Sequence, residues 1–207
     1  MVLAKTTSRP VRVWVATLAE ADLTLRAWLD DRELERFAGY QRDADRARAL
    51  LGAAMLCSAV AAELGMPPWA VPVHRACAGC GRGHGRPVGP DPRLALSVSH
   101  GGLLVVVALA VDHVVGVDIE RIDGRQREDV RRWTRAEARF KAGGGPDLGT
   151  RELPVPLPGH LLTLATAPDA TVEVLPAGRL LAVPTASRAM GQQTQPTICR
   201  ALVLPQP

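Results

Sequence analysis

The sequence predicts an α+β fold, and three observations support this class. Residues 43–64 have the apolar spacing of one long amphipathic helix. Residues 94–120 contain three consecutive segments in which apolar residues alternate or run without a break, as they do in β-strands. Residues 11–18 form a further alternating, strand-like segment ahead of the helix. With 207 residues, the chain is long enough for one large domain or two small ones.

The composition is that of a globular protein with a mild positive charge. Hydrophobic residues make up 47% of the chain, charged residues 22%, and the formal net charge is +4. This charge suits a phosphate-rich ligand or an acidic partner and is weak support for nucleic acid, so no nucleic-acid partner is expected. The first ten residues do not resemble a signal peptide, and the longest apolar run, residues 103–111, is too short to span a bilayer. We therefore expect a cytoplasmic protein without membrane contact, whose four cysteines stay reduced.

The helix predicted at residues 43–64 has clear signals at both ends. Asp43 can cap its start, Gly65 follows its end, and Pro67 and Pro68 prevent its continuation. One apolar stripe contains Leu50, Ala54, Cys57, Ala61 and Leu64. Cys57 lies in this stripe, which predicts a core thiol. Arginines near the first turns, Arg42, Arg46 and Arg48, form either a solvated face or a cationic cluster for phosphate.

Residues 74–91 are rich in glycine and proline and predict a loop. Cys77 and Cys80, with His74 and His84 nearby, have spacing that could bind zinc. A second Cys-x-x-Cys pair is missing from the sequence, however, so this is the minority interpretation. Three alternating glycines allow close approach to a ligand, and donors are supplied by the two histidines, Arg82 and Arg86. An anion-binding loop is the better interpretation.

The segments at residues 94–100, 103–111 and 114–120 predict three antiparallel strands in one sheet. Gly101 and Gly102 turn the chain after the first strand, and Asp112 turns it after the second. This arrangement would place Ser99 and His100 in the same sheet as the acidic end of the third strand.

The third strand ends in two acidic residues that share one face. Side chains alternate along a strand, so Asp118 and Glu120 lie with Gly116 on one face, while Val115, Val117 and Ile119 occupy the other. Neighbouring carboxylates repel, and a divalent cation such as Mg²⁺ relieves that repulsion. The alternative is a pair of solvated acids that contact Arg121 or Arg125.

A polar helix is predicted over residues 127–142, where Trp133, Ala136 and Phe140 share one face. Glu137 and Lys141 lie four residues apart on another face, as either a surface ion pair or functional groups. Weaker strand patterns follow at residues 161–167 and 171–175. Residues 184–207 have the composition of a poorly ordered tail.

Taken in order, the segments HRACAGCGRGHGRP, LSVSHGG, VVGVDIE and RRWTRAEARFKAGG resemble the 4′-phosphopantetheinyl transferase superfamily, in particular its surfactin-synthetase type. The resemblance covers residues 11–145 and implies a fold of two pseudo-related α/β halves, with the second half shortened. It places the first half at residues 1–112, the second at 113–183, and a tail at 184–207.

The resemblance implies a magnesium-dependent transfer of 4′-phosphopantetheine from coenzyme A to a serine of an acyl or peptidyl carrier protein, in polyketide or nonribosomal peptide biosynthesis. The second product would be 3′,5′-adenosine bisphosphate, and the enzyme would be a cytoplasmic monomer. The residues implied are Asp118, Glu120 and Glu137 for Mg²⁺, His84, Arg86, Ser99 and His100 for phosphates, Arg36 and Arg48 for the 3′-phosphate, and Lys141 as base, with Glu137 and His100 also in catalysis.

Two alignments of the last motif remain open. Trp133 to Lys141 matches the family's third motif, although Ala136 replaces a lysine there. The separation of 13 residues between Glu120 and Trp133 is shorter than the family pattern and instead fits an earlier helix of the family. A relative that binds coenzyme A or a carrier protein without transfer is therefore the second hypothesis, and a small zinc protein is the third.

Overall fold

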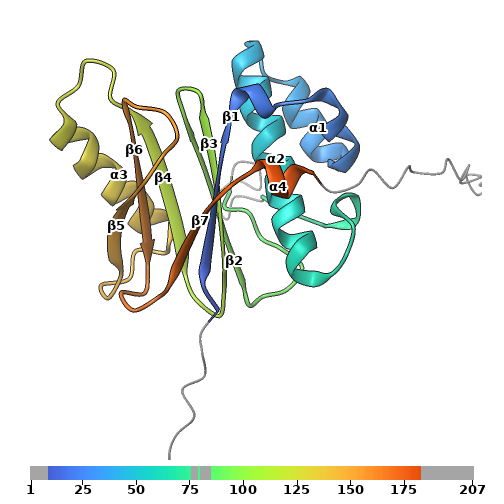
Figure 1. The fold of residues 1–207 in the computed structure, drawn as a ribbon. Coiled ribbons are helices and arrows are strands. Elements are labelled where there is room, and N and C mark those ends of the chain that lie inside the picture. Colours follow the sequence, from blue (N-terminus) through green and yellow to red (C-terminus); the bar gives the residue numbers. More distant parts are fainter. Residues whose placement is uncertain (1–8, 76–78, 80–84, 183–207) are drawn as a thin grey trace, which may run out of the picture.

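The computed structural model describes residues 9–75, 79 and 85–182. Two β-sheets pack face to face, and helices cover both outer faces (Figure 1). One outer layer is built around helix α2 (Asp43–Leu64) and the other is helix α3 (Arg127–Lys141). The mixed α+β class predicted from the sequence is confirmed.

The first sheet has the strand order β2-β3-β1-β7 and the second the order β4-β6-β5. Strand β7 pairs in parallel with β1, whereas the other ladders are antiparallel. The strands are β1 (Val11–Thr17), β2 (Leu94–Gly101), β3 (Leu104–Val111), β4 (Val115–Arg121), β5 (Gly149–Leu153), β6 (His160–Thr166) and β7 (Val172–Pro176). The remaining helices are η1 (Leu18–Glu20), η2 (Leu23–Trp28), α1 (Asp31–Ala38), η3 (Pro68–Ala70) and α4 (Gly178–Leu181).

The first sheet contributes to two hydrophobic cores because its side chains alternate between its faces. On the outer face, Trp14 and Val107 pack with Leu56 of α2. On the inner face, the sheet packs against Val117 and Leu164 of the second sheet. A smaller apolar cluster joins α3 to the outer face of the second sheet, and comprises Ala138, Ala142, Leu148 and Ala165.

The bounds and the glycine end of helix α2 agree with the prediction, but the cap predicted at Asp43 is wrong. Arg42 precedes the helix without a capping side-chain hydrogen bond, and Asp43 is the first helical residue and pairs with Arg46. The helix spans residues 43–64, and Gly65 follows in the left-handed conformation with φ of 66°. Its predicted apolar stripe lies in the outer core, and Cys57 is a buried core thiol. By length and composition α2 could cross a membrane, but most of it is buried, as expected for the core helix of a globular protein.

The prediction that residues 94–120 form three neighbouring strands of one sheet is wrong. Strands β2 and β3 do pair, but β4 belongs to the second sheet. The physical reason is that β3 already has β2 on one edge and β1 on the other, which leaves no free edge for β4. The predicted alternation along β4 is confirmed, because Val115, Val117 and Ile119 all lie in the core between the sheets.

Other departures concern the second half of the chain. Strand β5 has no counterpart in the prediction from sequence. The boundary predicted at residues 112 and 113 separates β3 from β4, but β7 and α4 then return to the first sheet and to α2. The layers therefore do not follow that boundary over the whole chain. The tail predicted at residues 184–207 lies outside the described residues.

Helix α3 packs through the face opposite to its large apolar residues. Val130, Thr134 and Ala138 are buried against the second sheet. Trp133 and Phe140 share the predicted face, which is exposed, and their exposed fractions are 53% and 74%.

Candidate functional site

The candidate site begins where the edge of one sheet meets the edge of the other, along strands β2 and β4. We call this contact the β2–β4 seam. Ser97 Oγ accepts a hydrogen bond from the backbone N–H of Val117 at 3.0 Å, and Ser99 Oγ accepts one from Ile119 at 3.3 Å. An edge strand leaves such N–H groups without a ladder partner, so serine hydroxyls satisfy them here. The seam thus joins the sheets through side chains.

A glycine allows helix α3 to approach the seam closely. A Cβ atom on Gly116 of β4 would overlap the backbone of Ala138 and Ala142. The absence of a side chain therefore lets the last turn of α3 lie directly on the strand. A hydrogen bond of 2.8 Å between the hydroxyls of Thr134 and Thr163 also holds the helix to β6. This contact places Lys141, at the end of α3, over the acidic residues of β4.

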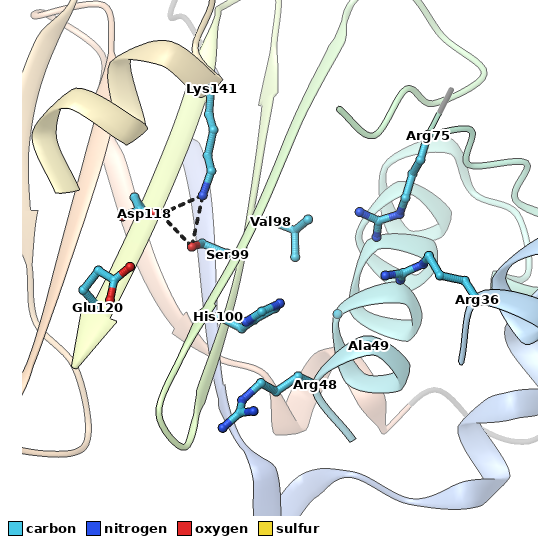
Figure 2. A pocket seen from close by; sticks show the side chains of 11 residues that line it. Arg36, Arg48, Ala49, Arg75, Val98, Ser99, His100, Asp118, Glu120 and Lys141 are labelled. Atoms are coloured by element: carbon cyan, nitrogen blue, oxygen red, sulfur yellow. Dashed lines mark hydrogen bonds and ion pairs between the residues drawn. The ribbon is translucent and has the colours of Figure 1, made fainter. Parts of the chain in front are cut away.

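Asp118, Ser99 and Lys141 form a connected polar cluster (Figure 2). Asp118 Oδ1 accepts hydrogen bonds from Lys141 Nζ at 2.7 Å and from Ser99 Oγ at 2.9 Å. Lys141 Nζ also donates to Ser99 Oγ at 3.1 Å. With the bond from Ile119, the Ser99 hydroxyl therefore uses its single proton and both acceptor positions. Such saturation fixes the hydroxyl in one orientation.

The second oxygen of Asp118 has a different environment. Asp118 is 4% exposed, and within the described residues its Oδ2 is buried without a hydrogen-bond partner. A buried carboxylate oxygen normally has a donor or a cation beside it. Glu120, two residues further on the same strand face, is partly exposed and pairs with Arg125 at 3.0 Å. Glu120 therefore has the contact with an arginine that is expected of a solvated acid without a metal role. Asp118 does not fit this alternative, because it is buried.

Cationic side chains form the opposite wall of a cavity that contains the acidic cluster. Figure 2 shows Arg36 and Arg75 on the side away from Asp118. His100 and Arg48 lie between Asp118 and these two arginines. The cavity has a volume of about 270 Å³, just below the range of about 300–1,000 Å³ that is usual for ligand sites. Its lining consists of Arg36, Arg48, Ala49, Gly52, Arg75, Val98, Ser99, His100, Asp118, Glu120 and Lys141.

Helix α2 and the β2–β3 turn fix the position of Arg48. Its Nε and Nη2 donate to the carbonyl oxygen of Gly102 at 3.0 and 2.6 Å, and its Nη1 pairs with Asp45 at 2.7 Å. Gly102 has φ of 55°, and a Cβ there would overlap His160. The glycine turn predicted at this point therefore both reverses the chain and presents its carbonyl to Arg48.

His100 lies in the cavity wall at the end of β2. The pKa of His100 is lowered below its ordinary value, first because the surrounding protein reduces the hydration of the ring, and then because Arg48 and Lys141 repel its protonated form. His100 is nevertheless an exposed residue, so it remains accessible to a ligand. A neutral imidazole that gains a proton beside an anion suits phosphate binding.

The structure brings together most, but not all, of the residues predicted for the site. Arg36, Arg48, Ser99, His100, Asp118, Glu120 and Lys141 line the one cavity. Glu137 does not line it, and no three His, Cys, Asp or Glu side chains of the described chain gather as a metal site. Arg86 lies beside Gly143, just after α3, outside the cavity lining. His84, Cys77 and Cys80 lie outside the described residues.

Two functional candidates have no counterpart in the prediction from sequence. Arg75 lines the cavity, and Glu33 of α1 contacts both Arg75 and Arg36. The spacing of three residues between Glu33 and Arg36 was the available signal for one contact. The contact with Arg75 joins residues 42 positions apart, which local spacing does not indicate.

Comparison of the chain with models of known protein families and with curated proteins finds no match. The geometry of the site and the resemblance of its motifs therefore carry the functional proposal.

The residues present fit a magnesium ion in part. Asp118 Oδ2, which is buried and has no partner in the part of the chain that the structure describes, and the neighbouring carboxylate of Glu120 are oxygen donors of the kind that Mg²⁺ prefers. Magnesium takes its other ligands from water and substrate phosphates, so two protein carboxylates suffice. The Lys141 ammonium, at 2.7 Å from Asp118, already supplies one positive charge there. Glu137 remains a predicted third ligand.

Proposed function

We propose that the protein transfers 4′-phosphopantetheine from coenzyme A to a serine of an acyl or peptidyl carrier protein, with the fold of the 4′-phosphopantetheinyl transferase superfamily. The observation that carries this proposal is the pairing, within one cavity, of a buried carboxylate with a wall of arginines and a histidine. Coenzyme A suits both sides, because it contains a diphosphate, which binds through a cation, and a separate phosphate, which binds directly to guanidinium groups.

In the proposed transfer, the serine oxygen of the carrier protein attacks the phosphorus that bears pantetheine. The bond from this phosphorus to the oxygen of the second phosphate breaks, and 3′,5′-adenosine bisphosphate leaves with that oxygen. Arg36, Arg48 and His100 bind and orient the phosphates from the cationic wall. Mg²⁺ held by Asp118 and Glu120 would neutralise charge on the diphosphate.

Lys141 is the candidate acceptor for the serine proton. Its Nζ lies within hydrogen-bond distance of both Asp118 and Ser99, so it forms part of the cavity wall beside the acidic cluster. To accept a proton, the Lys141 nitrogen must be released from its contacts with Asp118 and Ser99. We therefore propose that the ion pair of Lys141 with Asp118 opens in the complex with coenzyme A.

The experiment is a transfer assay with purified protein, coenzyme A, Mg²⁺ and a panel of purified carrier proteins. The expected result is a mass gain on the carrier serine and release of 3′,5′-adenosine bisphosphate, both abolished by chelation of Mg²⁺. Lys141→Ala should lose transfer, whereas Arg132→Ala, at an exposed position of the same helix outside the cavity lining, should keep it. Absence of a mass gain on every carrier would count against the proposal.

A second candidate function is binding of coenzyme A or a carrier protein without transfer. This alternative is favoured by the absence of a three-carboxylate group among the described residues and by the ion pair that occupies one oxygen of Asp118. Calorimetry separates the two functions, because binding with no turnover in the transfer assay identifies the second. Under either function we propose a cytoplasmic monomer that needs no nucleic acid or membrane.

A further inference from the structure

We infer that Glu33 is a positioning residue that holds Arg36 and Arg75 as a fixed pair of cations for a phosphate monoester, and that Arg75 belongs to the ligand-binding set. This inference rests on the proposed function, since it assigns one phosphate of coenzyme A to a particular pair of side chains. The resemblance described above concerns Arg36 and Arg48 and does not include Glu33 or Arg75.

The carboxylate of Glu33 uses both of its oxygens to orient the two arginines. Oε2 accepts hydrogen bonds from Arg36 Nε at 3.0 Å and Nη2 at 2.7 Å. Oε1 accepts one from Arg75 Nε at 2.9 Å. A carboxylate that receives donors on both oxygens fixes the planes of both guanidinium groups. Glu33 therefore links α1 to the segment that follows η3, and both arginines line the cavity.

Glu33, Arg36 and Arg75, which we call the Glu33 clamp, are themselves held in place by further contacts. Glu33 is 8% exposed, and its backbone N–H donates to Asp30 Oδ1 at 2.8 Å as part of the start of α1. Arg36 is held on its other edge, where Nη1 donates to the Tyr40 hydroxyl at 3.1 Å. Fixed side chains lose little conformational entropy when a ligand binds, which favours affinity.

The charges of the Glu33 clamp do not balance. One carboxylate faces two guanidinium groups, and the same cavity wall also contains Arg48 and His100. Burial lowers the pKa of Arg75, although Glu33 opposes this effect, so the charge of Arg75 has an energetic cost where it lies. An anion in the cavity would relieve that cost.

A phosphate monoester fits this pair better than the diphosphate does. A monoester carries up to two negative charges and three acceptor oxygens, which match two guanidinium groups. The diphosphate has an alternative partner, a cation beside Asp118 and Glu120 on the opposite wall. Figure 2 shows the two walls facing each other across the cavity, an arrangement that suits one ligand with both groups.

The test compares coenzyme A with 3′-dephospho-coenzyme A by titration calorimetry, on the full chain. Glu33→Gln should weaken the affinity for coenzyme A by about tenfold, because it removes the charge that orients two arginines. The same substitution should change the affinity for dephospho-coenzyme A by less than about threefold. Arg75→Ala should show the same loss of selectivity. Glu33→Asp, which keeps the carboxylate, should restore part of it. Glu35→Gln is the matched control, since Glu35 is exposed on the same helix.

Melting curves and circular dichroism show whether each variant is folded. A purely structural role of Glu33 would weaken the affinity for both ligands alike. Equal weakening of both ligands by Glu33→Gln, or unchanged selectivity in Arg75→Ala, would overturn the inference. Wild-type protein that binds with the expected selectivity but transfers nothing leaves the inference standing and removes the proposed transfer. Wild-type protein that does not bind coenzyme A overturns both.

Discussion

At the scale of single residues, Ser99 joins the backbone of one sheet to the charged groups of the site. Its hydroxyl accepts hydrogen bonds from the Ile119 N–H and from Lys141, and donates one to Asp118. It therefore connects the backbone of β4 to both charged groups. The same serine was predicted to contact a ligand phosphate. Its position in the seam assigns it a structural role as well.

Ser99→Ala should therefore destabilise the protein by about 1–3 kcal/mol, since it leaves buried partners without a hydrogen bond. Chemical denaturation measures this loss. Ser58→Ala is the matched control: Ser58 is also buried, but its hydroxyl has no partner within the described residues, so its loss should be near neutral. Equal effects of the two substitutions would contradict the assigned role of Ser99.

His100 makes a prediction about pH. Its pKa in the folded protein is lowered, chiefly by loss of hydration and then by Arg48, with Lys141 also lowering it and Asp45 opposing. Below about pH 6.5 the unfolded chain then binds more protons at this residue, so the free energy of unfolding falls as the pH falls. His100→Gln should remove this part of the pH dependence in denaturation experiments.

A bound phosphate reverses the preference and favours the imidazolium form. Binding of coenzyme A near pH 6 should therefore take up protons, which appears as a difference between calorimetric titrations in two buffers of unlike ionisation heat. His113→Gln, outside the cavity lining, should keep this uptake and His100→Gln should reduce it. Equal uptake in both variants would exclude His100 as its source.

The sequence allowed several site residues to be predicted, and the reason is local pattern. Asp118 and Glu120 end a β-branched strand, and Ser99 and His100 end another, so alternation alone indicated their faces. Glu33 and Arg75 escaped prediction because their roles arise from contact between distant segments. Lys141 was assigned through motif resemblance, and its contact with Asp118 depends on how closely α3 lies on β4.

At the scale of elements, the packing of α3 on β4 decides whether the site exists. Gly116→Ala should cost about 1–3 kcal/mol, because the new Cβ overlaps the backbone of Ala138 and Ala142 and forces the helix away. The same shift should separate Lys141 from Asp118 and weaken coenzyme A binding. Denaturation and calorimetry measure the two effects.

Gly89→Ala is the matched control for this substitution. A Cβ on Gly89 would meet its nearest neighbour, Leu96, at 3.5 Å, which is an ordinary contact distance. Its free energy of unfolding and its affinity for coenzyme A should stay close to wild type. If Gly116→Ala behaved as Gly89→Ala does, the close approach of α3 would not be a requirement of the site.

Elements were predicted where their signals are strong and missed where they are weak. Helix α2 has a start signal, a glycine end and a continuous stripe, and its bounds agree with the prediction. Strand β5 contains Gly149, Arg151 and Glu152 and lies at a sheet edge, so apolar alternation is almost absent. The sheet membership of β4 could not be read from its residues, because it depends on which edges β3 leaves free.

At the scale of the whole molecule, the first sheet couples the two main hydrophobic cores. Successive residues of β1, such as Val13 and Trp14, belong to different cores, so neither core can lose its packing without disturbing the other. We expect one cooperative unfolding transition, coincident by near- and far-ultraviolet circular dichroism and by tryptophan fluorescence. Two separated transitions would show that the sheets unfold independently.

The pairing of β7 with β1 has a consequence for synthesis. Val11 lies beside Val172 in a parallel ladder, so β1 receives this neighbour only after more than 160 further residues have been added. Until then β1 presents an open edge, to which a second nascent chain can add. Translation that stops before residue 172 would therefore yield a chain prone to aggregate, however complete the rest of its core.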